Sequence, residues 1–385
     1  MTTRIEFIDK LPSFAAVTNT AALITPFVNR ERLARPFNLI VAVTRHCNSR
    51  CKMCHIWQEK DTPTLSLDQY RTMFRLPFPS VRSLTITGGE PTLRKDLPEL
   101  FEIIRAACPK VEHAMLATSG LNVQRTLEHV TSILTNVAAA PGKLRLFEVQ
   151  ISLDGIDEMH DQVRGIHGFF TKVERVLAGL AELHQQFPML RVKLSTVVMP
   201  ENVGHVQRLR AFATERGLPI HFSPVVLSGT YYSNLETAEM IGFVPGSPAS
   251  QEAQSFFEQL GEEDASALRY YYRDVRAMMG GTTRSRTCMM GFFSCVVEYS
   301  GDVYACVNWE QQSFGNLLND SFDDIWFGPK AHAARLALRE TGCPTCPSMC
   351  YTQPINAGEL LATKARRVQK RAAAWLAPRP KESSI

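Results

Sequence analysis

Three cysteines near the start of the chain have a spacing suited to iron–sulfur chemistry. Cys47, Cys51 and Cys54 stand in a C-x3-C-x2-C arrangement directly after a short apolar run. Three thiolates on one loop can ligate three irons of a [4Fe–4S] cube, and the fourth iron then keeps a position for a small molecule. The alternative is a structural zinc completed by His46 or His55, but such sites usually consist of two paired cysteine knuckles. The spacing therefore favours a [4Fe–4S] cluster with an open iron.

A second group of cysteines lies in the last quarter of the chain. Its six members are Cys288, Cys295, Cys306, Cys343, Cys346 and Cys350. Cys288 and Cys306 flank a segment with a Ser300-Gly301 pair, which predicts a β-hairpin. Because two four-ligand cubes need eight cysteines, the six favour one further cluster, with a zinc knuckle on the last three as the alternative. Cys108 stands alone and is expected to be a buried thiol.

Alternating strand and helix patterns must position these cysteines. The expected strands are 37–43, 83–87, 113–118, 146–153, 191–198 and 220–226, and the expected helices between them are 67–75, 97–107, 123–134, 170–186 and 203–216. Strands separated by helices indicate βα units and a parallel sheet. We therefore predict an α/β fold, a partial (β/α)6 TIM-type barrel with a small C-terminal cysteine-rich auxiliary domain. The chemistry would lie at the carboxyl ends of the strands.

Composition narrows the class of protein. The chain has 385 residues with 45% hydrophobic and 21% charged residues, which is ordinary for a globular protein. We find no apolar run of the roughly 20 residues that a membrane span needs and no signal peptide, so we expect a cytoplasmic protein with reduced cysteines. The net charge of +4 is concentrated in residues 353–385, and a near-neutral body of this kind is not expected to bind nucleic acid.

At the first cysteine group the sequence resembles the radical S-adenosylmethionine (radical SAM) enzymes. Their motif is this three-cysteine loop with an apolar residue before the third cysteine, here Met53. A strand followed by Gly88, Gly89 and Glu90 resembles the Gly-Gly-Glu loop of the family. Glycines there let the backbone approach a ligand closely, and a carbonyl or carboxylate can accept from its ammonium group.

Later segments extend the resemblance. Thr118-Ser119-Gly120 stands where the family usually has Thr-Asn-Gly, and residues 150–170 resemble the Ser-x-Asp-Gly…His-Asp-x-x-Arg-Gly segment of the peptide-modifying and alcohol-oxidising branch. The resemblance implies that Ser152 and Arg164 hold the methionyl carboxylate and that Asn202 lies near the ribose. Asp154 either acts nearby or caps the turn that follows it.

The second cysteine group resembles the auxiliary-cluster domains called SPASM and twitch. Cys288-x12-Gly301-x4-Cys306 and a later Gly-Asn-Leu…Ile-Trp segment match their first part, but the closing cysteines are fewer than a full SPASM domain has. The resemblance favours one auxiliary [4Fe–4S] cluster, and a second, incompletely ligated one stays open. The preferred ligands are Cys288, Cys306, Cys343 and Cys346, with Cys350 and Cys295 in reserve.

The resemblance implies an enzyme that cleaves S-adenosylmethionine to a 5′-deoxyadenosyl radical, abstracts a substrate hydrogen, and oxidises or cross-links the substrate with the help of the auxiliary cluster. The expected substrate is a small alcohol, a sugar or a lipid, with a ribosomal peptide as the alternative. Only weak candidates for a base are present, namely Asp302, Glu310 and Asp154. A flavodoxin or ferredoxin is the expected electron donor. A non-catalytic iron–sulfur regulator or electron carrier is the rival class, although such a protein needs no S-adenosylmethionine pocket.

The patterns divide the chain into five parts. These are a preamble (1–38), the partial barrel (39–235), a helical linker (236–287), the auxiliary domain (288–352) and a basic C-terminal helix (353–385). Residues 358–376 form an amphipathic helix with a basic face in this prediction. Such a helix can make a peripheral contact with an anionic membrane, or it can dock on its own domain.

Overall fold

The computed structural model describes residues 33–59, 62–266, 268–284, 288–309, 312–340 and 346–352. Within these ranges one sheet of nine strands organises the molecule, in the order β6-β5-β4-β3-β2-β1-β7-β8-β9. The strands are β1 (Asn38–Ala42), β2 (Ser83–Thr87), β3 (His113–Thr118), β4 (Leu146–Ser152), β5 (Leu190–Val198), β6 (Ile220–Pro224), β7 (Ser294–Val297), β8 (Asp302–Tyr304) and β9 (Gly315–Asn316). The expected preamble lies mostly, and the basic C-terminal helix entirely, outside the described residues.

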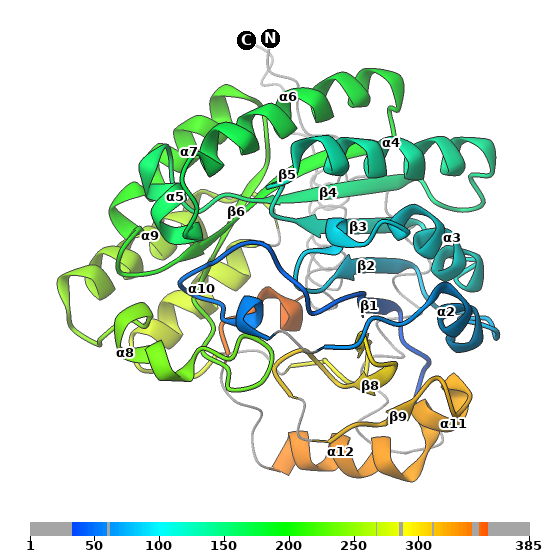
Figure 1. The fold of residues 1–385 in the computed structure, drawn as a ribbon. Coiled ribbons are helices and arrows are strands. Elements are labelled where there is room, and N and C mark those ends of the chain that lie inside the picture. Colours follow the sequence, from blue (N-terminus) through cyan, green and yellow to red (C-terminus); the bar gives the residue numbers. More distant parts are fainter. Residues whose placement is uncertain are drawn as a thin grey trace, which may run out of the picture.

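Strands β1 to β6 are parallel and pair in the order of the sequence. Helices connect them and cover one side of the sheet (Figure 1). These are α2 (Leu67–Met73), α3 (Leu97–Ala107), α4 (Val123–Ala139), α5 (Glu158–Arg164), α6 (Phe169–Gln186) and α7 (Val206–Glu215). Among the described strands β6 ends the order without pairing with β1, so the barrel is open. The predicted α/β partial barrel is confirmed.

Side chains alternate between the two faces of the sheet, and β4 shows how. Phe147 is fully buried and meets Phe101 of α3 edge to face, with ring centroids 5.5 Å apart. The neighbours Glu148, Gln150 and Ser152 therefore lie on the opposite face, away from the helices. That inner face carries polar side chains, and Ser152 lies there in register with Ser195 of β5. The helix-covered face thus forms the core, and the inner face is left for binding.

The last three strands continue the same sheet beyond β1. β7 pairs in parallel with β1, whereas β8 pairs antiparallel with β7 and with β9. The predicted hairpin turn is present, and Gly301 adopts a positive φ of 89°, which favours glycine. Helices α11 (Phe322–Phe327) and α12 (Pro329–Glu340) follow. The cysteine-rich segment is therefore anchored to the barrel through backbone hydrogen bonds of the sheet.

The connection between the two parts is helical. It contains α8 (Ala238–Ile241), α9 (Pro248–Glu263) and α10 (Leu268–Met279). Short 3-10 helices complete the described chain: η4 (Ile56–Gln58), η5 (Pro91–Leu93), η6 (Val203–His205), η7 (Leu235–Thr237) and η8 (Met349–Thr352). None of the helices within the described ranges is long and apolar enough to cross a membrane.

Candidate functional site

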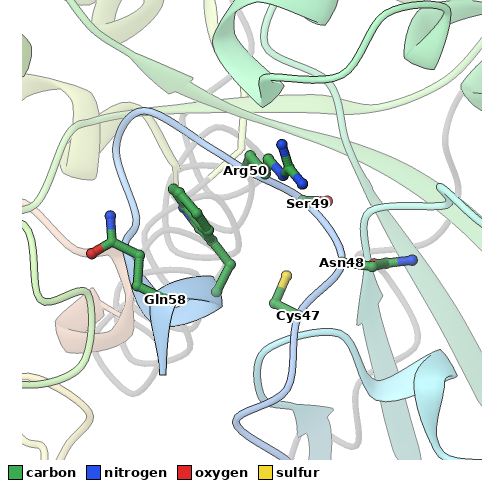
Figure 2. Close-up of a pocket in the computed structure, with 6 residues that line it drawn as sticks. Cys47, Asn48, Ser49, Arg50 and Gln58 are labelled. Carbon is green, nitrogen blue, oxygen red and sulfur yellow. The ribbon is translucent and has the colours of Figure 1, made fainter. Parts of the chain in front are cut away.

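The first cysteine loop leaves β1 at the carboxyl edge of the parallel strands, where it borders a cavity of about 560 Å³. The cavity is lined by Cys47, Asn48, Ser49, Arg50, Trp57 and Gln58. Figure 2 shows the sulfur of Cys47 directed into this space and Gln58 reaching it from η4. The loop and η4 therefore form two walls of one pocket.

Backbone hydrogen bonds fix the loop from two sides. On one side the N–H groups of Arg50 and Lys52 donate to the carbonyls of Arg164 and Val163 at the end of α5, at 3.1 and 3.0 Å. On the other side the N–H of Gly89 donates to the Thr44 carbonyl at 2.7 Å. The shape of the loop is thus set by segments more than 40 residues away in the sequence.

Of the three thiols of the loop, Cys51 is buried, and Cys47 and Cys54 are half-buried. Burial raises the pKa of Cys47 and of Cys54 to about 12 in each case, and it raises the pKa of Cys51 against the opposing charge of Arg164. Charges on Cys51, Glu90 and Cys54 add to the effect at Cys47. Among the described side chains no preassembled group of three metal-binding residues is present. The set of three thiols beside an open cavity nonetheless suits a cube with one open iron, and binding iron would displace the thiol protons.

The Gly-Gly-Glu segment packs against the cysteine loop. A Cβ on Gly89 would lie 2.3 Å from the carbonyl oxygen of His46, and one on Gly88 would lie 2.3 Å from that of Thr44. Gly88 also has a φ of 144°, which other residues rarely adopt. In this structure the glycines are needed for a close backbone contact between the two loops.

The carboxylate of Glu90 is buried and saturated with hydrogen bonds. It accepts from the N–H and hydroxyl of Thr92, the hydroxyl of Thr118, and the N–H and hydroxyl of Ser119. These bonds join the ends of β2 and β3. The side chains of Glu90 and Ser119 are therefore already partnered within the protein. Direct contact of either with the cofactor stays a prediction.

Arg164 is the buried cation of the site. Its Nη2 lies 2.6 Å from the carboxylate of Asp154, and its Nη1 donates to the sulfur of Cys51 at 3.4 Å. Burial alone would lower the pKa of Arg164, but the adjacent Asp154 and Cys51 outweigh burial and raise it. Arg164 is therefore held charged beside the cysteine loop. A ligand carboxylate that pairs with Arg164, as predicted, would have to share its guanidinium with Asp154.

Asp154 and Asn202 form a hydrogen-bonded junction at the ends of β4 and β5. The Asp154 carboxylate accepts from the N–H of Val197 at 2.8 Å, and the Asn202 amide donates to the carbonyls of Asp154 and Val197 at 2.9 Å. The Asn202 oxygen accepts from the N–H of Met199. Since all its polar groups are used in this way, the expected contact of Asn202 with a ribose is untested, and its visible role is to shape the junction.

Ser152 differs from the other predicted pocket residues. It ends β4 on the inner face and is half-buried. Within the described residues its hydroxyl has no hydrogen-bond partner. It is therefore the predicted side chain that is left available to a ligand.

The second cysteine group separates into two environments. Cys306, Cys346 and Cys350 all act on the ring of Tyr232, which places them in one region, whereas Cys295 is fully buried in β7 opposite Leu39 of β1. Cys108 is buried as expected. The preferred ligand Cys343 and the base candidate Glu310 lie outside the described residues, and which four cysteines bind iron stays a prediction.

Asp302, another candidate for a base, is used by the hairpin. Its two carboxylate oxygens accept from the hydroxyl of Ser300 at 2.6 Å and from the amide of Asn316 at 3.0 Å. These contacts hold the turn and the neighbouring strand. The structure gives Asp302 a structural role, and its role as a base is untested.

Two residues of the site were not singled out from the sequence. His160 is fully buried, and its Nδ1 faces the N–H of Asp154 at 3.1 Å, while burial and the charge of Arg164 hold its pKa well below the usual value. Asn234 is fully buried and donates to the carbonyl of Met53 at 2.7 Å. The His160-Asp161 pair in the sequence was a usable signal, but nothing in the sequence points to Asn234.

Two family models match the chain, one in the barrel and one in the cysteine-rich C-terminal part. Residues 41–213 match the model of the radical SAM superfamily, and residues 288–351 match an iron–sulfur cluster-binding domain, SPASM. The two matches include both cysteine groups and the predicted pocket residues.

Curated relatives share much of their length with the chain. The mycofactocin maturase MftC of Mycobacterium ulcerans is 27% identical over 76% of this chain and 75% of the relative. The pre-heme d1 synthase of Dinoroseobacter shibae is 23% identical over 86% of this chain and 83% of the relative. The chain is thus similar to enzymes of more than one substrate class.

Solved structures share the fold. The enzyme anSMEcpe with bound AdoMet superposes with a TM-score of 0.54 at 22% identity, over 78% of this chain and 82% of the other. SuiB of Streptococcus suis bound to its precursor peptide SuiA gives a TM-score of 0.56 at 13% identity, over 89% and 76%. At these identities the likeness concerns the fold.

Proposed function

The chain belongs to the radical SAM superfamily, in the branch with a SPASM-type iron–sulfur domain, and from this premise we propose that it oxidatively modifies side chains of a peptide. It is an enzyme that uses S-adenosylmethionine, a [4Fe–4S] cluster and auxiliary iron–sulfur. When bound, these groups supply an electron and the 5′-deoxyadenosyl radical that abstracts a hydrogen. The observation that carries the radical chemistry of this proposal is the three-thiol loop beside an open cavity at the carboxyl edge of the parallel strands.

The chain's own residues divide the work at the cofactor site. We assign cluster ligation to the three thiols of the loop. The Ser152 hydroxyl and the carbonyl of Gly89 are available for polar contacts with the amino-acid part of S-adenosylmethionine, whereas the carbonyl of Gly88 already accepts from the Tyr231 hydroxyl. Glu90 and Asn202 position the loops that carry these groups. In this assignment the Arg164 cation attracts the cofactor carboxylate while Asp154 keeps the guanidinium in place.

The auxiliary ligand set is proposed from the proximity of the cysteines. Cys306, Cys346 and Cys350 are the described cysteines of the second group whose charges act on Tyr232, so they are three of the four proposed ligands. Cys288 or Cys343 supplies the fourth. This assignment moves Cys350 from the reserve set into the ligand set and leaves Cys295 out.

The substrate proposal draws on the relatives and on the surface beside the cavity. A peptide is favoured by the 27% identity to a mycofactocin maturase over three quarters of both chains. The expected small alcohol, sugar or lipid gains no support from the relatives. Four large apolar side chains in the stretch between β6 and α9 are exposed by 43% to 71%, namely Leu227, Leu235, Met240 and Val244. Exposed apolar side chains gathered on one segment suit the binding of an apolar stretch of peptide.

A tetrapyrrole is the second candidate substrate. The pre-heme d1 synthase match covers 86% of the chain, more than the maturase match does. Either reaction also needs an external one-electron donor, which we propose to be a flavodoxin or ferredoxin.

The test is anaerobic turnover with each substrate class. Reconstituted protein, S-adenosylmethionine and dithionite are incubated with peptides encoded beside the gene, or with a porphyrin that carries propionate side chains. We expect a peptide product that has lost hydrogen, formed in proportion to 5′-deoxyadenosine. Modification of the porphyrin alone would contradict the peptide proposal and support the second candidate.

A further inference from the structure

One segment after β6 crosses the first cysteine loop; we call residues 225–237 the crossing segment. The carbonyl of Tyr232 accepts from the N–H of His55 at 2.8 Å, and the amide of Asn234 donates to the carbonyl of Met53 at 2.7 Å. The Asn234 side chain also accepts from the N–H of Ser228 at 2.8 Å. These bonds close the crossing segment on itself and fix it to the residues on either side of Cys54.

Two adjacent tyrosines of the crossing segment are held differently. The Tyr231 ring is 6% exposed, its hydroxyl donates to the Gly88 carbonyl at 3.2 Å, and the guanidinium of Arg45 lies 5.5 Å from its ring centre. The Tyr232 ring stands edge to face against it, with centroids 5.0 Å apart. Tyr231 is therefore locked by polar contacts and provides a rigid support for Tyr232.

Tyr232 lies between the two cysteine groups. Its pKa is raised by burial and then by charges on Cys350, Cys54, Cys346 and Cys306. Figures 1 and 2 both show the short orange-red helix η8, which contains Cys350, beside the blue helix η4 that follows Cys54. The ring therefore has cysteines of both groups as neighbours.

The hydroxyl of Tyr232 is not used by the described part of the protein. Among those residues it has no hydrogen-bond partner, although the residue is half-buried. Buried tyrosine hydroxyls usually find a partner. The cysteines whose charges act on this group offer sulfur atoms as acceptors, since a thiolate or sulfide of an iron–sulfur cluster accepts hydrogen bonds.

We propose that Tyr232 is a positioning residue shared by the two iron–sulfur sites, whose ring fills the space between them and whose hydroxyl donates to a sulfur there. The inference rests on the proposed function in that both sites must hold iron. Hydrogen bonds to cluster sulfurs and exclusion of water both set the reduction potential. Tyr232 would thus influence the potentials of both sites.

The test is a redox titration of both clusters, followed by their electron paramagnetic resonance signals. Anaerobically reconstituted full-length protein is compared with Tyr232→Phe, Tyr232→Leu and the control Leu235→Ala, which changes an exposed side chain of the same segment. Tyr232→Leu removes the ring and should shift both midpoint potentials. Tyr232→Phe removes only the hydroxyl and should make at least one potential more negative. Leu235→Ala should shift neither.

Each outcome decides part of the inference. A Tyr232→Leu shift confined to one cluster overturns the shared position, and unchanged potentials in Tyr232→Phe overturn the hydrogen bond. If Tyr232→Leu fails to retain iron, the nearly isosteric Tyr232→Phe decides. The wild type is assayed in parallel for 5′-deoxyadenosine. Its absence, together with the expected shifts, would reject the proposed function and leave the role of Tyr232 standing.

Discussion

The carboxylate of Asp154 and the guanidinium of Arg164 form a buried ion pair, 2.6 Å apart, directly behind the second cysteine of the loop. Asp154 follows β4, and Arg164 ends α5. The carbonyl of Arg164 also accepts the N–H of Arg50 in the loop. One pair therefore connects the end of a strand, the end of a helix and the cysteine loop, so the loop cannot move without disturbing the ion pair.

Removing one partner of this pair should be more damaging than removing both charges. Arg164→Met leaves the fully buried Asp154 without its cation, and breaking a buried pair in this way typically costs about 3–5 kcal/mol. Asp154→Asn combined with Arg164→Met removes both charges and should recover a large part of the loss. Urea unfolding of the iron-free proteins measures this. A double variant no more stable than Arg164→Met would show that the charge balance is unimportant.

A methyl group at Gly89 should disrupt the contact between the two loops. In Gly89→Ala the new Cβ would lie 2.3 Å from the carbonyl oxygen of His46, so one backbone must shift. Displacement of about 1 Å at a reacting site can cost roughly 100-fold in rate. We expect a loss of that order in 5′-deoxyadenosine formation. Gly204→Ala is the control, because its Cβ would have its nearest contact at 3.9 Å, and equal rates for the two variants would refute the explanation.

The sequence was sufficient to predict most of the barrel. The strands at 83–87 and 113–118 were predicted with the bounds that the structure has, because each is a short buried run between turn residues. The pairing of β7 with β1 was not predicted. A parallel pair between segments some 250 residues apart leaves no local pattern, since the alternation of a strand does not identify its neighbour.

The site was predicted by residue type but not by contact. Glu90 and Asn202 were expected to face the cofactor, yet the structure shows their polar atoms bound to the backbone and hydroxyl groups around them. A motif identifies residues that a site needs, and it does not distinguish a ligand contact from a bond that shapes the loop. The position of Tyr232 could not be predicted, because its two cysteine neighbourhoods are distant in the sequence.

Stability should fall in acid partly through His221. Burial, with a smaller effect of Lys193, lowers the pKa of His221 to about 3, and its Nε2 lies 2.9 Å from the hydroxyl of Ser195. The unfolded chain takes up a proton near the ordinary value of about 6.5, whereas the folded protein does not. This contribution is therefore present above about pH 6.5 and is lost as the pH falls toward about 3, at most about 1.4 kcal/mol per pH unit.

The variant His221→Gln isolates this effect, since it removes the titrating ring and can still form a hydrogen bond with Ser195. Urea unfolding at pH 7 and pH 5 should show a shallower pH dependence for the variant than for the wild type. Identical slopes would mean that His221 takes up its proton in the folded state as easily as in the unfolded state.

Two cysteine substitutions separate ligand from core thiol in the auxiliary part. Cys306→Ala should remove about four of about eight irons per chain if it ligates a cube. Cys295→Ala should keep the iron and cost about 1 kcal/mol of stability, because Cys295 is a fully buried thiol packed in β7. Iron analysis after anaerobic reconstitution checks both. A greater iron loss in Cys295→Ala would overturn the ligand assignment.

The most direct test of the central claim is reductive cleavage of S-adenosylmethionine by the reconstituted protein. Wild-type protein with dithionite should form 5′-deoxyadenosine even without substrate. The variant with Cys47, Cys51 and Cys54 all changed to Ala should form none and should retain only the auxiliary iron. Cleavage at the wild-type rate by this variant, or none by wild-type protein that holds its full iron content, would contradict the assignment of the cysteine loop.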